Sequence, residues 1–129
     1  MMGAIELMLA ALGGVASPSP TPDLRNPEYD HCLDQSGGVT SDMRACNHAE
    51  LQRLDALLNA EYRRTMARLP DAAGRARLRT LQRRWLKTRW NACYEAAKEE
   101  EGGTIWLLMV DGCGIGTVQD RIEWLRRFR

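Results

Sequence analysis

The chain has 129 residues, with 18 Lys and Arg against 17 Asp and Glu, giving a formal net charge of +1. This length suits one domain, so it argues against a multidomain enzyme. The balanced charge argues against a nucleic-acid-binding protein, which usually carries a clear basic excess. No apolar stretch is long enough to span a bilayer, so we expect no transmembrane segment in the mature chain.

The N-terminal sequence is typical of an exported protein. Residues 4–16 read AIELMLAALGGVA, an apolar run that ends in small residues, as a signal peptide does before its cleavage site. An ordinary N-terminal helix is the alternative, because Glu6 interrupts the run and no basic residue precedes it. Residues 17–27 are rich in proline, which predicts an extended tether. We therefore expect a signal peptide over 1–16, a tether over 17–27, a domain over 28–129, and a periplasmic or secreted location.

The first half of the domain predicts two long helices. A helical spacing runs through Leu51, Leu54, Leu58, Tyr62, Met66 and Leu69. This helix spans about 41–69, with Thr40, Ser41 or Asp42 as candidate N-caps, and Pro70 ends it. Asp71 can cap a second helix that reaches Glu101, before Gly102 and Gly103. The short turn between the helices makes them antiparallel.

The remaining sequence predicts two shorter helices. Residues 104–110 form one or two apolar turns, and Gly112, Gly114 and Gly116 predict a loop. Residues 117–128 then form an amphipathic helix. No segment has the alternation of a strand. The expected fold is therefore all-α: a small disulfide-stabilised helical bundle built on a long antiparallel helix hairpin.

Motifs on the two long helices point to a known family. The first helix contains Asp55-x-x-Leu58-Asn59-x-x-Tyr62, and the second contains Gln82-x-x-Trp85-x-x-x-Arg89-x-x-x-Cys93. They are followed by Gly102-Gly103, Cys113, and Thr117 with Arg121. From about Tyr29 to Leu125, this order resembles the LprI-type lysozyme-inhibitor family of small exported bacterial proteins. The resemblance implies a helical, disulfide-bonded domain of the cell envelope or its exterior that inhibits lysozyme.

The even set Cys32, Cys46, Cys93 and Cys113 in a small exported chain predicts two disulfides. We expect Cys32–Cys46 and Cys93–Cys113, each closing a short loop. Cys46–Cys93 is the rival, because a straight hairpin brings these two residues level. Zinc held by Cys32 and Cys46 with His31 and His48 is the other alternative, but zinc sites usually have closely spaced cysteine pairs. We expect no metal and no cofactor.

Polar residues on facing sides of the hairpin predict a structural network. Gln82, Trp85 and Arg89 share one helix face. On the facing helix we expect Asn59 near Gln82, and Asp55 near Trp85 and Arg89, with Tyr62 on the same face. Arg121 is a second candidate partner for Asp55. No nucleophile–base pair is visible, so we expect no enzyme activity.

Two surfaces are candidates for binding. The first is the acidic end of the second helix and the glycine-rich segment 102–116 after it; the residues are Glu95, Glu99, Glu100, Glu101 and Trp106. Through it, the protein is expected to inhibit a lysozyme-type muramidase by occluding the active-site cleft. The second is the basic stretch 75–89. It supports the alternative of an envelope interaction or structural module that binds a partner protein or anionic polymer.

Overall fold

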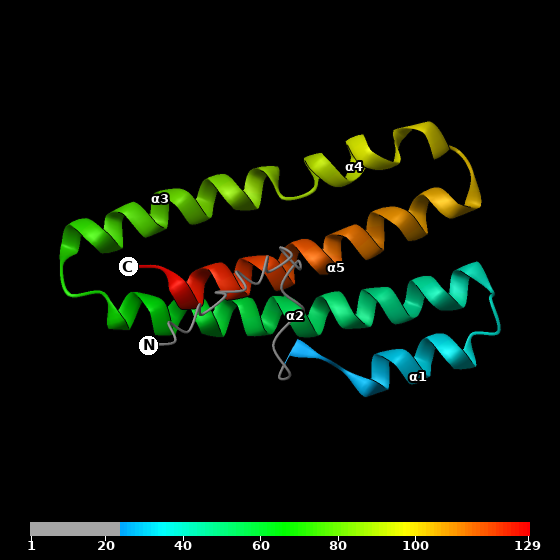
Figure 1. Ribbon diagram of the computed structural model, residues 1–129, viewed down its shortest axis with the longest axis horizontal. Helices are drawn as coiled ribbons and strands as arrows, with labels where there is room; N and C mark the ends of the chain where they lie inside the picture. Colours follow the sequence, from blue (N-terminus) through cyan, green and yellow to red (C-terminus); the bar gives the residue numbers. More distant parts are fainter. Residues whose placement is uncertain (1–23) are drawn as a thin grey trace, which may run out of the picture.

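The computed structural model describes residues 24–129, which form only helices and their connections (Figure 1). In chain order these are α1 (Pro27–Gln35), α2 (Thr40–Arg68), α3 (Ala72–Thr88), α4 (Asn91–Ala97), the 3₁₀ turn η2 (Lys98–Glu100) and α5 (Thr104–Arg127). The predicted all-α class is therefore confirmed for this part of the chain. The predicted signal peptide, and the tether as far as residue 23, lie outside the described residues.

Helix α1 was not predicted from the sequence. Asn26 caps it, because its side-chain oxygen accepts a hydrogen bond from the Glu28 backbone N–H at 3.1 Å, and Pro27 occupies the first turn. Asparagine followed by proline is a favourable start for a helix, and this signal could have identified α1. The last residues of the predicted tether are packed onto the domain, because Leu24 is fully buried.

The turn between α2 and α3 follows the expected chemistry. Leu69 leaves the helical conformation before Pro70, and the Asp71 carboxylate accepts a hydrogen bond from the Gly74 N–H at 2.7 Å. Helices α2 and α3 run antiparallel (Figure 1). The predicted side-chain caps of α2 are wrong: its N-cap is Val39, and no side chain caps it. The Ser36–Val39 turn fixes this start instead, through the Val39 N–H bonded to the Ser36 carbonyl.

The second long helix is shorter than predicted. Helix α3 ends at Thr88, and α4 begins at Asn91 after a break at Arg89 and Trp90. The sequence shows no proline or glycine there, so local propensity gives no signal for the break. Both residues at the break contact other helices by their side chains, as described below. We attribute the break to these tertiary contacts and to the disulfide at Cys93.

Helix α5 corrects the prediction for the C-terminal third. The predicted loop at Gly112, Gly114 and Gly116 is wrong, because one helix runs from Thr104 to Arg127. Glycine costs about 1 kcal/mol relative to alanine in a helix interior, but it does not forbid a helix. Gly114 is buried where the Trp90 ring packs, and a Cβ atom there would lie 2.1 Å from that ring. Packing therefore requires glycine at this position within a helix.

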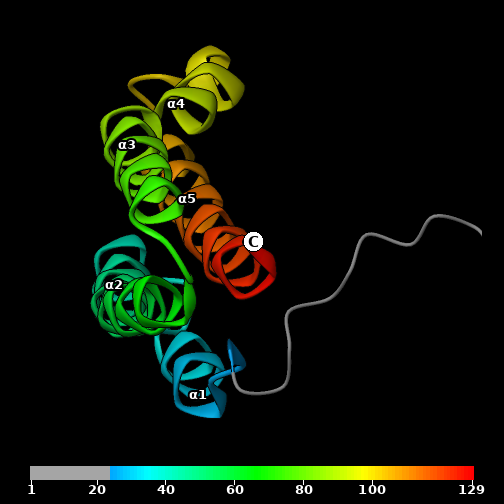
Figure 2. The same ribbon diagram turned by 90° about the vertical axis from the view of Figure 1, so that its left-hand side faces the viewer.

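The core forms mainly between α2 and α5, which pack most extensively against each other. These two helices run parallel, and the α3–α4 segment provides the return connection (Figure 1). Seen end on, α1 lies on the far side of α2 from the other helices (Figure 2). The core side chains are Leu24, Leu51, Leu54, Leu58, Leu69, Leu78, Ile115, Val118, Ile122, Leu125 and Phe128.

Candidate functional site

Two disulfides hold the short helices against the long ones. Cys32–Cys46 joins α1 to α2, and Cys93–Cys113 joins α4 to α5, with Cα–Cα distances of 5.8 and 5.6 Å. The predicted pairing is confirmed, and the rival Cys46–Cys93 is excluded. The zinc alternative is also wrong, because both cysteines that it needs are in disulfides. Within residues 24–129, no group of histidine, cysteine and acidic side chains is arranged to hold a metal ion.

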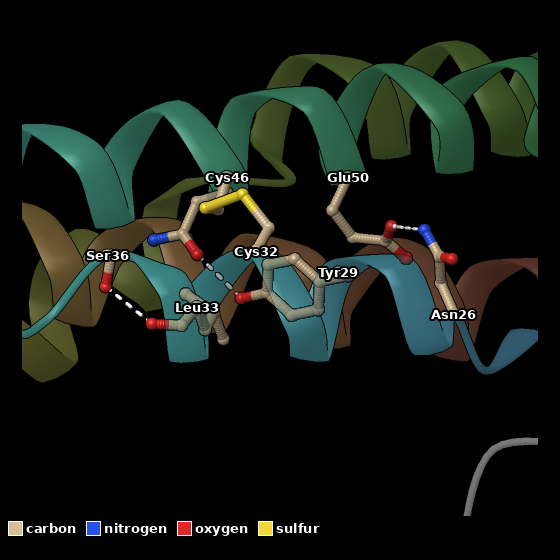
Figure 3. Close-up of a disulfide and its surroundings, with 8 residues drawn as sticks. Asn26, Tyr29, Cys32, Leu33, Ser36, Cys46 and Glu50 are labelled. Carbon is tan, nitrogen blue, oxygen red and sulfur yellow. Dashed lines mark hydrogen bonds between the residues drawn. A yellow bond between two sulfur atoms is a disulfide. The ribbon is translucent and has the colours of Figure 1, made fainter.

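Polar contacts surround the first disulfide (Figure 3). The Tyr29 hydroxyl donates to the Asn47 side-chain oxygen at 2.6 Å, and the Asn26 amide donates to Glu50 at 2.7 Å. Glu50 is only 3% exposed and also accepts from Arg53 Nε at 3.0 Å. Burial, followed by the negative charge of Glu50, raises the pKa of Tyr29 above its ordinary value. This region contains satisfied pairs that fix α1 on α2.

The structure brings Asp55 and Arg89 together. The two guanidinium Nη atoms donate to the two carboxylate oxygens at 2.9 and 3.3 Å, which is a bidentate pair between α2 and the α3–α4 break. The Arg89 guanidinium also lies 5.5 Å from the Trp85 ring centre and 5.3 Å from that of Trp90. The side chain of Arg89 is 15% exposed and that of Asp55 is 39% exposed. The pair holds the end of α3 against α2.

The rest of the predicted network is arranged differently. Arg121, the second candidate partner for Asp55, is paired elsewhere: its Nε donates to the Gln82 side-chain oxygen at 2.9 Å. Gln82 is buried, whereas Asn59 is exposed, and no hydrogen bond joins these two residues. Tyr62 and Trp85 are half-buried and pack against the core. The cause is α5, which takes the position beside α2 that the hairpin prediction gave to the second helix.

We predict that Asp55→Ala lowers the free energy of unfolding by about 1–3 kcal/mol, because it leaves a mostly buried guanidinium without its carboxylate. Because solvent screens the partly exposed Asp55 carboxylate, we expect a loss in the lower part of that range. Chemical denaturation monitored by circular dichroism measures the loss. Asn59→Ala, one turn further along α2 at an exposed position, is the control and should have little effect. Unchanged stability of Asp55→Ala would contradict a structural role for the pair.

The acidic candidate surface lies at the end of the molecule formed by α4, η2 and the start of α5. The carboxylates of Glu95, Glu99, Glu100 and Glu101 are exposed. Among residues 24–129, only Glu95 of these four forms an ion pair, with Lys98 at 2.6 Å. The half-buried Trp106 ring lies 6.2 Å from the Tyr94 ring, centre to centre. The predicted glycine-rich binding loop is reduced to Gly102 and Gly103, because the rest is α5. We call these acidic residues with Tyr94 and Trp106 the acidic end.

Exposed apolar side chains accompany the acidic end. Tyr94, Ile105 and Met109 are 49%, 54% and 40% exposed. These three residues are not among the predicted binding residues, although the helical spacing of Ile105 and Met109 places those two on one face of α5. The N-terminus of α5 has no side-chain cap, so its first N–H groups have no side-chain acceptor there. The end of the molecule therefore combines acidic, aromatic and hydrogen-bond-donating groups.

The basic stretch 75–89 is divided between packing and exposure. Arg75 donates to the Leu69 carbonyl at 3.0 Å, Arg77 lies over the Phe128 ring at 5.2 Å, and Arg89 pairs with Asp55. The other cations of the stretch are exposed and form no ion pair with residues 24–129; they are Arg79, Arg83, Arg84 and Lys87. These four residues define the basic face of α3.

Together these features define a small all-helical domain with two disulfides, a type that is common among proteins of oxidising compartments. No helix among the described residues is long and apolar enough to cross a membrane. The family model for the lysozyme inhibitor LprI matches residues 32–125, and the chain belongs to this family. Neither the curated proteins nor the solved structures include a match.

Proposed function

We propose that this protein is exported and inhibits a lysozyme-type muramidase by occluding its active-site cleft. Membership of the lysozyme-inhibitor family over residues 32–125 is the observation that carries the proposal. The two disulfides agree with a periplasmic or secreted location. In this proposal the protein acts by binding and performs no chemistry on its partner.

The acidic end is the surface that fits such a partner best. Its unpaired carboxylates would attract a cationic lysozyme and align it before contact. Trp106 and Tyr94 would then supply apolar area at the centre of the contact, where aromatic side chains contribute most to binding. The uncapped N-terminus of α5 would present N–H donors toward the pair of carboxylates in the muramidase cleft.

The experiment is titration of the mature protein into lysozyme cell-wall lysis, with several lysozyme types. We expect lysis to slow in a saturable, near-stoichiometric manner and a complex to co-elute on gel filtration. Unchanged lysis at about tenfold molar excess, with every lysozyme type, would overturn the proposal. Heat-denatured protein is the control.

We predict that replacing Glu99, Glu100 and Glu101 together by glutamine weakens inhibition by about tenfold or more at low salt, with a smaller effect at high salt. The matched control replaces three equally exposed acids on α1 with their amides: Glu28, Asp30 and Asp34. The control removes the same charge but leaves the acidic end intact. Equal losses from both variants would show that only net charge matters and would contradict docking through the acidic end.

The basic face of α3 favours a second candidate, an envelope module that binds an anionic polymer. Helix α3 contains several cations and no acidic residue. In this case the protein would bind anionic polymer with an affinity that falls steeply as the salt concentration rises, because release of counterions drives such binding. Arg83→Gln with Arg84→Gln would abolish that binding and leave lysozyme inhibition unchanged, which separates the two candidates.

A further inference from the structure

A hollow of about 430 Å³ opens between α3 and α5, away from the acidic end. It is lined by Trp85, Thr117, Asp120, Arg121, Trp124 and Arg127. Two indole rings thus form apolar walls, and two cations, a carboxylate and a hydroxyl supply polar groups. A small-molecule site commonly has this composition: apolar or aromatic walls with a few polar groups that set orientation.

Arg121 is the unusual residue of this hollow. Its guanidinium lies between the two indoles, 3.6 Å from the Trp124 ring centre and 5.3 Å from that of Trp85. Its one hydrogen bond is that from Nε to Gln82, and its buried Nη2 atom has no partner among residues 24–129. Burial lowers the pKa of this guanidinium to about 10. The cation is therefore partly desolvated and forms no ion pair with a carboxylate of residues 24–129.

Most other partly buried arginines of the described chain have such a carboxylate; Arg75, which donates to the Leu69 carbonyl at 3.0 Å, is an exception. Arg89 pairs with Asp55, Arg53 pairs with Glu50, and Arg44 Nε lies 3.2 Å from Asp111. Buried cations without an anion are costly, and buried donors without an acceptor are rare. The two indole contacts offset only part of that cost. Arg121 also lines the hollow, so an external anion there can reach the accessible edge of its guanidinium.

We propose that this hollow binds a small sugar acid, that is, a ring with hydroxyl groups and a carboxylate. The sugar carboxylate binds to Arg121, where a charge-assisted hydrogen bond is strong, and Arg127 adds a second cation at the rim. The apolar face of the sugar ring packs on the indole surface that the guanidinium leaves uncovered, and Asp120 accepts hydrogen bonds from hydroxyl groups. The single negative charge of Asp120 disfavours phosphate-rich polyanions. This site is independent of the proposed inhibition of lysozyme.

The test is titration of the ¹⁵N-labelled protein with N-acetylmuramic acid, with the indole N–H signals of the tryptophans as readout. We expect saturable shifts at Trp85 and Trp124, whereas Trp90 and Trp106 lie outside the hollow and serve as internal controls. N-acetylglucosamine lacks the carboxylate and should bind about tenfold more weakly or less. No shift up to about 10 mM would overturn the proposal, since even a weak monosaccharide site saturates in that range. Equal binding of the two sugars would overturn it as well.

Variants separate this site from general electrostatic attraction. Arg121→Gln should weaken binding of N-acetylmuramic acid by about tenfold or more. Arg83→Gln is the matched control, because it removes an exposed arginine of α3 that lines a different hollow. An equal loss in both would overturn the proposal.

A second pair of variants tests the site if Arg121→Gln does not fold. Arg127→Gln and Asp120→Asn change exposed side chains and should move the affinity in opposite directions. The first removes a cation and weakens binding. The second removes a negative charge but keeps an acceptor for hydroxyls, so it strengthens binding. Changes in the same direction, or no change in either variant, would overturn the proposal.

Discussion

Replacing Gly114 by alanine should lower the free energy of unfolding by about 1–3 kcal/mol, since inserting a methyl group into a filled core forces its neighbours to move. The new Cβ atom would lie 2.1 and 2.3 Å from two carbons of the Trp90 ring. Trp90 cannot yield freely, because its ring is half-buried and lies under the Arg89 guanidinium. Thermal and denaturant unfolding measure the loss.

The same helix contains two matched controls. A Cβ at Gly112 or Gly116 would meet no atom within 4 Å, so alanine there removes only the helix penalty of glycine. We expect each to stabilise the protein by up to about 1 kcal/mol. In a Trp90→Ala background, Gly114→Ala should also become neutral or stabilising, because the clash has gone. If all three glycine variants behave alike, the packing of Trp90 on α5 is misassigned.

Replacing Cys93 and Cys113 together by serine should lower the free energy of unfolding by about 3 kcal/mol, because the disulfide closes a loop of 20 residues. The variant should also lose activity at the acidic end. Without the bridge, α4 and η2 pack on α5 less extensively than α2 does, and Tyr94 is about half exposed. In this variant, therefore, both the stability and the inhibition of lysozyme per folded molecule should fall.

The other disulfide provides the comparison. Cys32 and Cys46 are 14 residues apart, so serine at both positions should cost a similar amount, about 3 kcal/mol. This bridge joins α1 to α2 and does not touch the acidic end. Inhibition per folded molecule should stay unchanged in that variant. Loss of inhibition in the Cys32 and Cys46 variant alone would place the binding surface at α1 instead.

Local sequence was sufficient wherever neighbouring residues decide the structure. The spacing of Leu51, Leu54 and Leu58, followed by Pro70, predicts α2 to within a residue at each end, because helical periodicity and the proline stop are local properties. The turn at Pro70 and Asp71 forces the antiparallel direction of α3. That direction in turn brings Asp55 to Arg89, about equally far from the turn. The disulfide pairing was predictable because each bridge joins two cysteines that are close in the sequence and so closes a short loop.

Tertiary structure decided the features for which local signals are weak or misleading. The glycines of α5 disfavour a helix locally, but the packing of Trp90 on Gly114 and the bridge at Cys113 outweigh that cost. Because α5 is continuous, it lies parallel to α2 and takes the central place that local reasoning gave to the second helix. This places Arg121 at Gln82 between two indoles, although the sequence also made it a second candidate partner for Asp55. The partner of a long side chain depends on which helix lies beside it, and that is set by the burial of the whole core.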